Sequence, residues 1–178
     1  MSISQSSLTQ CHDRIQLAQL LGVELSTLTY YAYGKGKRYM HFEIPKKSGE
    51  VRIISAPVDG LNNIQKKLAE HLDKLYKPHA AAHGFISKKS ILSNASPHVN
   101  KRAVLNIDLE DFFPTITATR IIGLLKSNHF KMNNEVASTI AALCTYKDRL
   151  PQGASTSPVI SNMICYRLDR ELTALSKS

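Results

Sequence analysis

The clearest pattern of hydrophobic and polar positions lies between residues 60 and 76. Leucine or isoleucine recurs there every three or four residues, and most positions between them are polar or charged. This spacing places the apolar side chains on one stripe of a helix, so we predict an amphipathic helix. Its apolar positions are Leu61, Ile64, Leu68, Leu72 and Leu75, and its solvent positions are Lys66, Lys67, Glu70, Asp73 and Lys74.

Shorter patterns predict both strands and helices in the rest of the chain. Residues 39–44 (YMHFEI) and 51–54 (VRII) have the composition of strands, and the Gly-containing turn between them predicts a hairpin. The apolar run at 103–107 (AVLNI) predicts a short buried strand. Further helices are predicted near residues 12–21, 117–127 and 133–144.

A last helix is predicted to run from Pro158 toward the end of the chain. Ser157 would be its N-cap and Pro158 its first residue, a position that proline favours. Its apolar stripe consists of Ile160, Ile164, Leu168, Leu172 and Leu175. We find no internal repeat, low-complexity tract or linker, so the elements predict one mixed α/β (α+β) unit, rich in helices with short antiparallel strands.

Length and composition are those of a globular domain. The chain has 178 residues, of which 43% are hydrophobic, enough to bury a core. Its first ten residues lack the pattern of a signal peptide, and no apolar run approaches the roughly 18 residues of a membrane span, so we expect a cytoplasmic protein without membrane contact. Three widely spaced cysteines predict reduced thiols rather than disulfides or a zinc site.

The positive charge is concentrated in one region. The formal net charge is +9, and residues 35–102 hold fourteen Lys and Arg against five Asp and Glu, while the remainder holds nine of each. Such a region can attract the phosphate backbone of a nucleic acid. It can equally be a set of solvated lysines, and charge alone leaves both interpretations open.

Three acids follow the predicted strand at 103–107, namely Asp108, Glu110 and Asp111. An aspartate at the end of a buried strand is held rigidly at the edge of a sheet, where its carboxylate can bind a cation such as Mg²⁺. The alternative is structural: Asp108 would cap a turn, and the other two acids would begin a helix, where they complement the helix dipole.

A loop with unusual chemistry lies at residues 150–162 (LPQGASTSPVISN). Gly153 allows the backbone to approach a ligand or another strand closely, and Gln152 supplies a donor and an acceptor beside it. Taken alone, the loop could simply start the helix that follows.

These stretches, in this order, resemble the reverse transcriptase family. Residues 106–116 (NIDLEDFFPTI) resemble its first palm motif, residues 150–158 (LPQGASTSP) the later palm loop and helix, and residues 46–57 (KKSGEVRIISAP) its basic fingers segment. Residues 79–85 (HAAAHGF) and 90–98 (SILSNASPH) are similar to the segment that precedes this motif in bacterial retron reverse transcriptases. The resemblance covers the chain from about residue 39 onward.

The resemblance implies an RNA-directed DNA polymerase that extends a DNA or RNA primer with dNTPs on an RNA template. Asp108 would be the catalytic ligand of two Mg²⁺ ions, assisted by the backbone carbonyl of Leu109. Phe113 would select deoxynucleotides by packing under the sugar. The other nucleotide-binding residues would be Lys46, Lys47, Arg52, Asp111, Phe112, Gln152 and Gly153, and the RNA-binding residues Lys88, Lys89, Asn94, His98, Lys101 and Arg102.

The family also implies an architecture and partners. The fold would be the fingers and an incomplete palm of a right-hand polymerase. Residues 1–100 would hold the N-terminal helices and fingers, 101–118 the first palm motif, 119–150 a helical insertion and 151–178 the palm loop and helix, with the rest of the palm and the thumb absent. The partners would include a structured retron RNA and an effector protein in antiviral defence.

One departure from the family pattern affects the expected activity. Reverse transcriptases supply further catalytic carboxylates from an aromatic-x-Asp-Asp hairpin, and this chain contains no Asp-Asp dipeptide. One aspartate would hold two metal ions roughly 4 Å apart poorly, so we expect the isolated chain to be inactive. Two alternatives stay open: a catalytically dead module that binds RNA or a partner, and an unrelated Mg²⁺-dependent phosphotransferase or nuclease centred on Asp108, Glu110 and Asp111.

Overall fold

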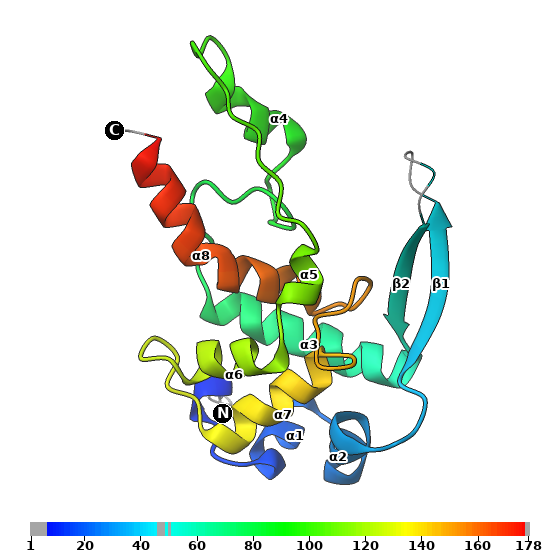
Figure 1. The fold of residues 1–178 in the computed structure, drawn as a ribbon. Helices are drawn as coiled ribbons and strands as arrows, with labels where there is room; N and C mark the ends of the chain where they lie inside the picture. The colour runs from blue at the N-terminus through cyan, green and yellow to red at the C-terminus, as the bar shows by residue number, and fades with distance from the viewer. Residues whose placement is uncertain (1–6, 46–48, 50, 177–178) are drawn as a thin grey trace.

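The computed structural model shows a layer of helices from which a β-hairpin and an extended segment project (Figure 1). It describes residues 7–45, 49 and 51–176. In chain order the elements are η1 (Leu8–Gln10), α1 (Arg14–Leu21), α2 (Leu25–Tyr33), β1 (Tyr39–Pro45), β2 (Val51–Pro57), α3 (Asp59–Leu75), α4 (Ile91–Ala95), η2 (Ser96–His98), α5 (Phe112–Thr115), α6 (Ala118–Lys126), α7 (Asn134–Cys144) and α8 (Ser157–Leu175). The mixed, helix-rich class with short antiparallel strands is therefore confirmed.

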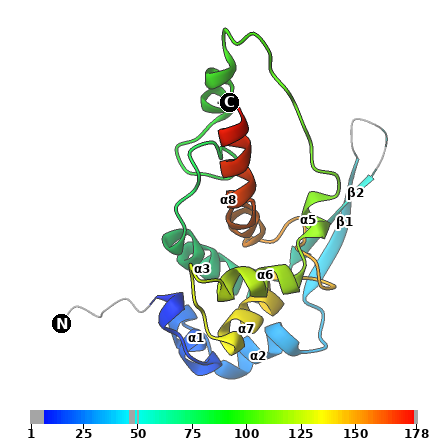
Figure 2. The same cartoon turned by 60° about the vertical axis from the view of Figure 1, so that its left-hand side comes forward.

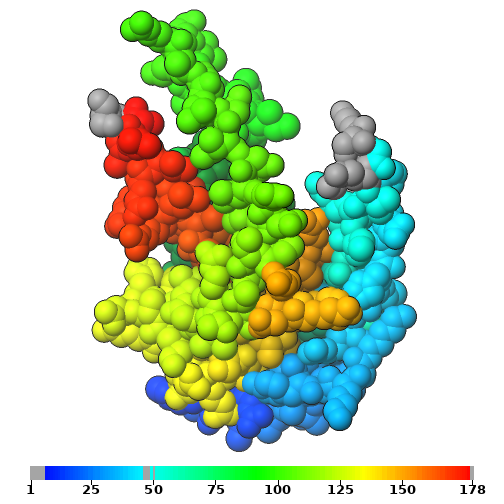
Figure 3. Space-filling model, viewed as in Figure 1, coloured from blue at the N-terminus to red at the C-terminus, as the bar shows by residue number. Residues whose placement is uncertain are grey.

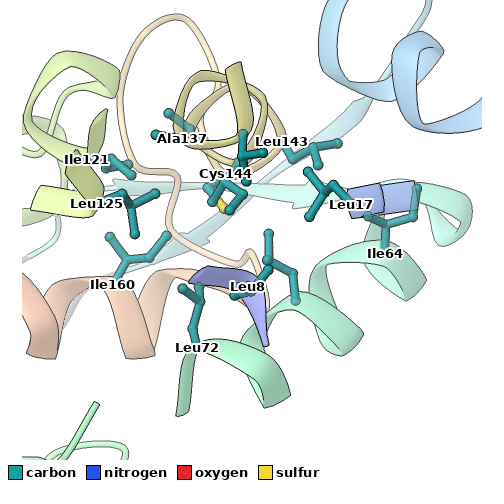
Figure 4. Packing of buried hydrophobic residues seen from close by; sticks show 14 of the residues in the cluster. Leu8, Leu17, Ile64, Leu72, Ile121, Leu125, Ala137, Leu143, Cys144 and Ile160 are labelled. Carbon is teal, nitrogen blue, oxygen red and sulfur yellow. The ribbon is translucent and has the colours of Figure 1, made fainter. Parts of the chain in front are cut away.

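The core forms around α3, where the prediction from the hydrophobic pattern is confirmed. Leu61, Ile64, Leu68 and Leu72 are buried, and the five charged positions on the opposite face are exposed. Figure 4 shows side chains from η1, α1, α3, α6, α7 and α8 meeting in one cluster. Burial of these apolar groups away from water is the main favourable contribution to folding.

One buried polar side chain fastens the hairpin to this core. The Nε2 of Gln65 on α3 donates hydrogen bonds to the Tyr39 hydroxyl at 3.0 Å and to the Leu143 carbonyl at 2.8 Å. Tyr39 begins β1 and Leu143 lies near the end of α7. The base of the hairpin is thus held against two helices by one amide group.

The predicted hairpin is confirmed, and its register assigns residues to its two faces. The strands are antiparallel, from the pair Tyr39 with Pro57 to the pair Pro45 with Val51. Because side chains alternate along a strand, His41 lies on the same face as Ser55, and Arg52 lies on the same face as Ile54. This is the only sheet among the residues that the structure describes.

The strand predicted at residues 103–107 is wrong. These residues form no strand and all are exposed, with Leu105 84% and Ile107 63% accessible. A strand needs a neighbour for its backbone hydrogen bonds, and the two described strands pair only with each other. We call residues 87–111 the arm; with α4 and η2 it extends away from the helices and returns to α5 (Figure 2).

The last helix differs from its prediction in two respects. It begins at Ser157, and the N-cap is Thr156 rather than Ser157, whose hydroxyl instead donates to the Pro151 carbonyl at 2.7 Å. Its apolar stripe is buried only at the start: Ile160 is inaccessible, whereas Leu168 and Leu172 are more than a third exposed. The first half of α8 therefore packs on the core and the second half projects from it (Figure 1).

The helices predicted near 12–21, 117–127 and 133–144 are confirmed as α1, α6 and α7.

The three cysteines are free, as predicted, and burial raises the pKa of the Cys144 thiol to about 12. None of the helices within the described ranges combines the length and apolar character of a membrane span.

Candidate nucleotide and nucleic-acid site

A short loop between α7 and α8 connects the hairpin with the motif around Asp108. We call residues 146–153 the junction loop. It opens with a tight turn in which Tyr146 and Arg149 exchange two backbone hydrogen bonds, at 2.9 and 3.0 Å. Lys147 and Asp148 both have positive φ, as a type I′ turn requires. The turn therefore has a defined shape fixed by its own backbone.

One end of the junction loop is bound to α5. The Arg149 guanidinium donates to the Pro114 carbonyl at 2.6 Å, and the Leu150 N–H donates to the Ile116 carbonyl at 2.9 Å. These bonds hold the segment that follows the three acids. A charged donor of this kind forms stronger hydrogen bonds than a neutral one.

The other end of the junction loop is bound to β2. The Ser55 N–H donates to the Gln152 carbonyl at 2.8 Å. Gly153 has φ +111°, and a β carbon there would lie 2.8 Å from Ile54 Cγ2. Of the two uses of Gly153 considered from sequence, a ligand or a strand, the structure shows the close approach to a strand. In Figure 3 the surface is hollowed between the hairpin and the segment leading into α5, with junction-loop residues (orange) between them.

The three acids are exposed at the end of the arm. The Asp108 Oδ1 accepts a hydrogen bond from the Leu109 N–H at 2.9 Å, and Asp111 occupies the N-cap position of α5 without a side-chain capping bond. The Asp108 carboxylate thus bonds the backbone just before the turn at Glu110 and Asp111, and of these two acids Asp111 stands at the start of a helix. Asp108 is exposed to solvent and not buried in the apolar core.

These acids fit a metal ion only in part. The Asp108 carboxylate and the Leu109 carbonyl are hard oxygen ligands of the kind that Mg²⁺ prefers. However, no group of three or more His, Cys, Asp or Glu side chains that could hold a metal is present in the part of the chain that the structure describes. Glu110 instead lines a pocket of about 280 Å³ against Ile164, Cys165 and Leu168 of α8.

The two phenylalanines of the motif pack together at α5. Their ring centroids lie 5.3 Å apart at an interplanar angle of 63°, an edge-to-face contact, and both side chains rest partly on the core. Phe112 lines the pocket against α8, together with Leu109. The backbone just beyond Phe113 is the part bound by Arg149.

The predicted phosphate-binding residues are only partly described. Arg52 is exposed, on the hairpin face that carries Ile54 and so faces the side on which Gly153 makes contact. Lys46 and Lys47 lie outside the described residues. The structure therefore brings Gln152 and Gly153 to the strand that carries Arg52.

The six predicted RNA-binding residues share one location, the arm. All are exposed; they are Lys88, Lys89, Asn94, His98, Lys101 and Arg102. The segment just before the arm is attached to α8 by the Asn162 side-chain amide, which donates to the Gly84 carbonyl at 3.0 Å. The arm thus presents four cations and two polar side chains to solvent.

Limited digestion with trypsin tests the exposure of the arm. We expect the first cuts after Lys88, Lys89, Lys101 or Arg102, because exposed backbone outside long helices is cleaved first. Lys66 and Lys74, within α3, are matched sites that should resist. Mass spectrometry identifies the fragments, and first cuts in α3 would contradict the described exposure.

Sequence reasoning missed the contribution of Tyr146 and Arg149. The Lys-Asp pair between them is a weak turn signal. The hydrogen bond from Arg149 to Pro114 joins residues 35 positions apart, so no local sequence pattern predicts it.

Comparison with known proteins gives the family. Residues 44–176 match the model of the reverse transcriptase (RNA-dependent DNA polymerase) family, and the chain belongs to this family. This confirms the resemblance found in the motifs.

Within that family the similarity is to retron enzymes. The chain is 35% identical to the retron Mx65 reverse transcriptase of Myxococcus xanthus over 90% of its length, 33% identical to the retron Mx162 enzyme of the same organism over 97%, and 36% identical to the retron Ec86 reverse transcriptase of Escherichia coli over 88%. The matches cover 42%, 40% and 49% of these relatives, so the chain spans less than half of their length.

Proposed function

We propose that this chain forms the nucleotide-binding and template-binding part of a retron-type RNA-directed DNA polymerase. The observation that carries the proposal is the junction loop. Its hydrogen bonds join the segment after Asp108 to the strand that carries Arg52. In the proposed right-hand arrangement, residues 1–100 and 119–150 belong to the fingers, and residues 101–118 and 151–178 belong to the palm.

Each residue then has a chemical role. Asp108, with the Leu109 carbonyl, would hold Mg²⁺, which when bound supplies positive charge to the reacting phosphate and to the primer hydroxyl. Arg52 would bind the triphosphate, because a guanidinium forms paired charge-assisted bonds to phosphate oxygens. Phe113 would limit space at the sugar, and Gln152 and Gly153 would complete the wall of the nucleotide pocket.

Template binding is assigned to the arm. Its four cations would contact phosphates, and Asn94 and His98 would make hydrogen bonds to RNA. A structured retron RNA, an effector protein and a bacterial cytoplasmic setting belong to the same proposal.

Primer extension tests the proposal in two proteins. The first is the chain alone, and the second is a chimaera in which residues 1–178 replace the matched part of the retron Ec86 enzyme. With an RNA template, a primer, dNTPs and Mg²⁺, we expect no extension by the chain alone, because it offers one catalytic aspartate, and extension by the chimaera. A chimaera that folds by circular dichroism and binds the template, yet never extends the primer, would overturn the polymerase assignment.

A second candidate function is favoured by the exposed basic arm. The chain could be a catalytically dead module that binds structured RNA. Binding through phosphates weakens steeply with salt, so RNA titrations at several salt concentrations test it. Salt-independent binding, or none, would count against it.

Cleavage of labelled RNA or DNA by the chain in Mg²⁺ would instead support a nuclease.

A further inference from the structure

One histidine of β1 is hydrogen-bonded both to β2 and to the junction loop. The His41 Nδ1 lies 3.0 Å from the Ser55 hydroxyl, and its Nε2 lies 3.1 Å from the Tyr146 hydroxyl. A neutral imidazole donates at one nitrogen and accepts at the other, and a hydroxyl can do either, so both bonds form with either tautomer. We call His41, Ser55 and Tyr146 the hairpin latch.

The Tyr146 side of the hairpin latch rests on a rigid support. The centroid of the Tyr146 ring lies 4.8 Å from that of Tyr39 and 5.0 Å from that of His41. Tyr39 is buried and accepts the hydrogen bond from Gln65, and the Tyr146 backbone is closed onto Arg149. The fold therefore presents the Tyr146 hydroxyl to His41 in one place.

The hairpin latch ties both ends of the junction loop to one residue of β2. The Ser55 N–H donates to the Gln152 carbonyl at 2.8 Å, and the Ser55 hydroxyl is joined through His41 to Tyr146. Within the described part of the chain, the bond between His41 and Tyr146 is the side-chain hydrogen bond that joins the turn of the loop to the hairpin. Loss of the imidazole would therefore release the turn from the hairpin.

The junction loop holds the hairpin from both faces. Tyr146 contacts the face that carries His41. The opposite face carries Arg52 and Ile54, and it is the one that closely approaches Gly153. A substitution at His41 therefore removes no group from the face that carries the proposed triphosphate ligand.

The hairpin has little support beyond the hairpin latch. Residues 42–45 and 51–53 are all exposed. Arg52 lies three residues nearer the tip than Ser55, which is about 10 Å along the strand. A tilt of about 6° at the hairpin latch would thus move Arg52 by about 1 Å, enough to weaken the directional bonds of a guanidinium to phosphate oxygens.

We propose that His41 is a positioning residue for nucleotide binding. By bonding Ser55 and Tyr146 it holds the outer hairpin, and with it Arg52, in one orientation relative to the Asp108 motif. Its effect on nucleotide binding rests on the proposed function, whereas its hold on the hairpin does not. The two are therefore measured separately.

Amide hydrogen exchange, followed by NMR in the full chain, measures the hold on the hairpin. The amides of Ser55, Tyr146 and Arg149 donate the backbone bonds that the hairpin latch supports. In His41→Ala they should exchange about tenfold faster, as expected for the loss of two hydrogen bonds at a partly exposed position. The amide of Leu68, in the core of α3, should keep its exchange rate and serves as the internal reference.

Two substitutions separate the bonds of the imidazole. Asparagine places its amide near the position of Nδ1 and glutamine near that of Nε2. His41→Gln can therefore keep the bond to Tyr146 and should restore most of the protection at the turn, whereas His41→Asn should resemble His41→Ala there. Tyr146→Phe removes the hydroxyl, keeps the ring and should match His41→Asn.

Glu43→Ala is the matched control. Glu43 is the next residue outward on the same face of β1, and it is exposed. Its side chain makes no hydrogen bond among those described. Exchange at the three amides should stay within about twofold of the original, as is usual for a surface substitution.

Steady-state extension by the chimaera measures the effect on the nucleotide. His41→Ala should raise the KM for dNTP about five- to tenfold and leave kcat within about twofold, because a displaced Arg52 weakens binding in the ground state and transition state alike. His41→Gln should restore the KM, and Glu43→Ala should change neither constant. A loss of folded enzyme alone would lower kcat without raising the KM.

Two results would reject the inference. Equal exchange in His41→Ala and Glu43→Ala would show that His41 does not hold the hairpin, and faster exchange with an unchanged KM would show that this hold does not serve the nucleotide. Failure of the polymerase proposal is recognised separately, by a chimaera that never extends a primer. Exchange would then decide alone, with a rise in His41→Ala that is reversed in His41→Gln retaining the hairpin latch without that function.

Discussion

Replacing Asp108 with asparagine in the chimaera is expected to lower the rate of primer extension by at least about 100-fold. Asparagine keeps the volume and can still accept the Leu109 N–H, but it loses the negative charge that binds Mg²⁺. Even residues that only support metal ligands typically contribute 10- to 100-fold, so removing a ligand should cost about as much or more. Single-turnover extension over a range of Mg²⁺ concentrations measures the change.

The control for this experiment is Glu110→Gln. Glu110 is a neighbouring exposed acid whose side chain lines the pocket against α8, so the same loss of charge should change the rate by less than about threefold, as expected for a surface substitution. If Asp108→Asn and Glu110→Gln behave alike, the catalytic assignment of Asp108 is wrong.

Gly153→Ala is expected to lower the free energy of unfolding by about 2–4 kcal/mol, from backbone strain and overpacking together. At φ +111° any side chain is strained, and the new β carbon would lie 2.8 Å from Ile54 Cγ2 and 3.2 Å from the Ser55 carbonyl oxygen. Urea unfolding followed by circular dichroism measures the loss.

Two further variants separate the causes of this loss. Gly123→Ala in α6 is the matched control, because nothing lies within 4 Å of its added β carbon, and a helical Gly to Ala change should stabilise by about 0.5–1 kcal/mol. Ile54→Ala in the Gly153→Ala background removes the side-chain overlap but not the backbone strain. Partial recovery is therefore expected, and a Gly153→Ala protein as stable as the original would refute the close contact.

The part of the fold that was predictable is the part specified by local pattern. The stripe from Leu61 to Leu75 determines α3, and a turn between two β-rich segments determines the hairpin. By contrast, α2 was not predicted, because threonine and tyrosine are modest helix formers and the packing of Leu28 and Ala32 outweighs their preference. The strand proposed at 103–107 required a partner that the described chain does not place beside it.

The candidate site was also predictable only in part. Residue types and order identified Asp108, Gln152 and Gly153 as members of a family motif, but sequence could not show what holds them together. The hydrogen bond between Ser55 and Gln152 joins residues almost a hundred positions apart in the sequence. The partner of Arg149 is a backbone carbonyl, which every residue has, so the identity of the residue at that position does not indicate the bond. Such contacts depend on the whole fold and leave no periodic trace.

The junction loop also has a mechanical consequence. Its turn is closed by two backbone hydrogen bonds, and the loop is hydrogen-bonded to α5 at one side and to β2 at the other. A rigid loop that is hydrogen-bonded to both α5 and β2 transmits a displacement of one element to the other. Bending of the hairpin should therefore displace Pro114, six residues beyond Asp108. The thermal motions of the hairpin and of α5 should be correlated.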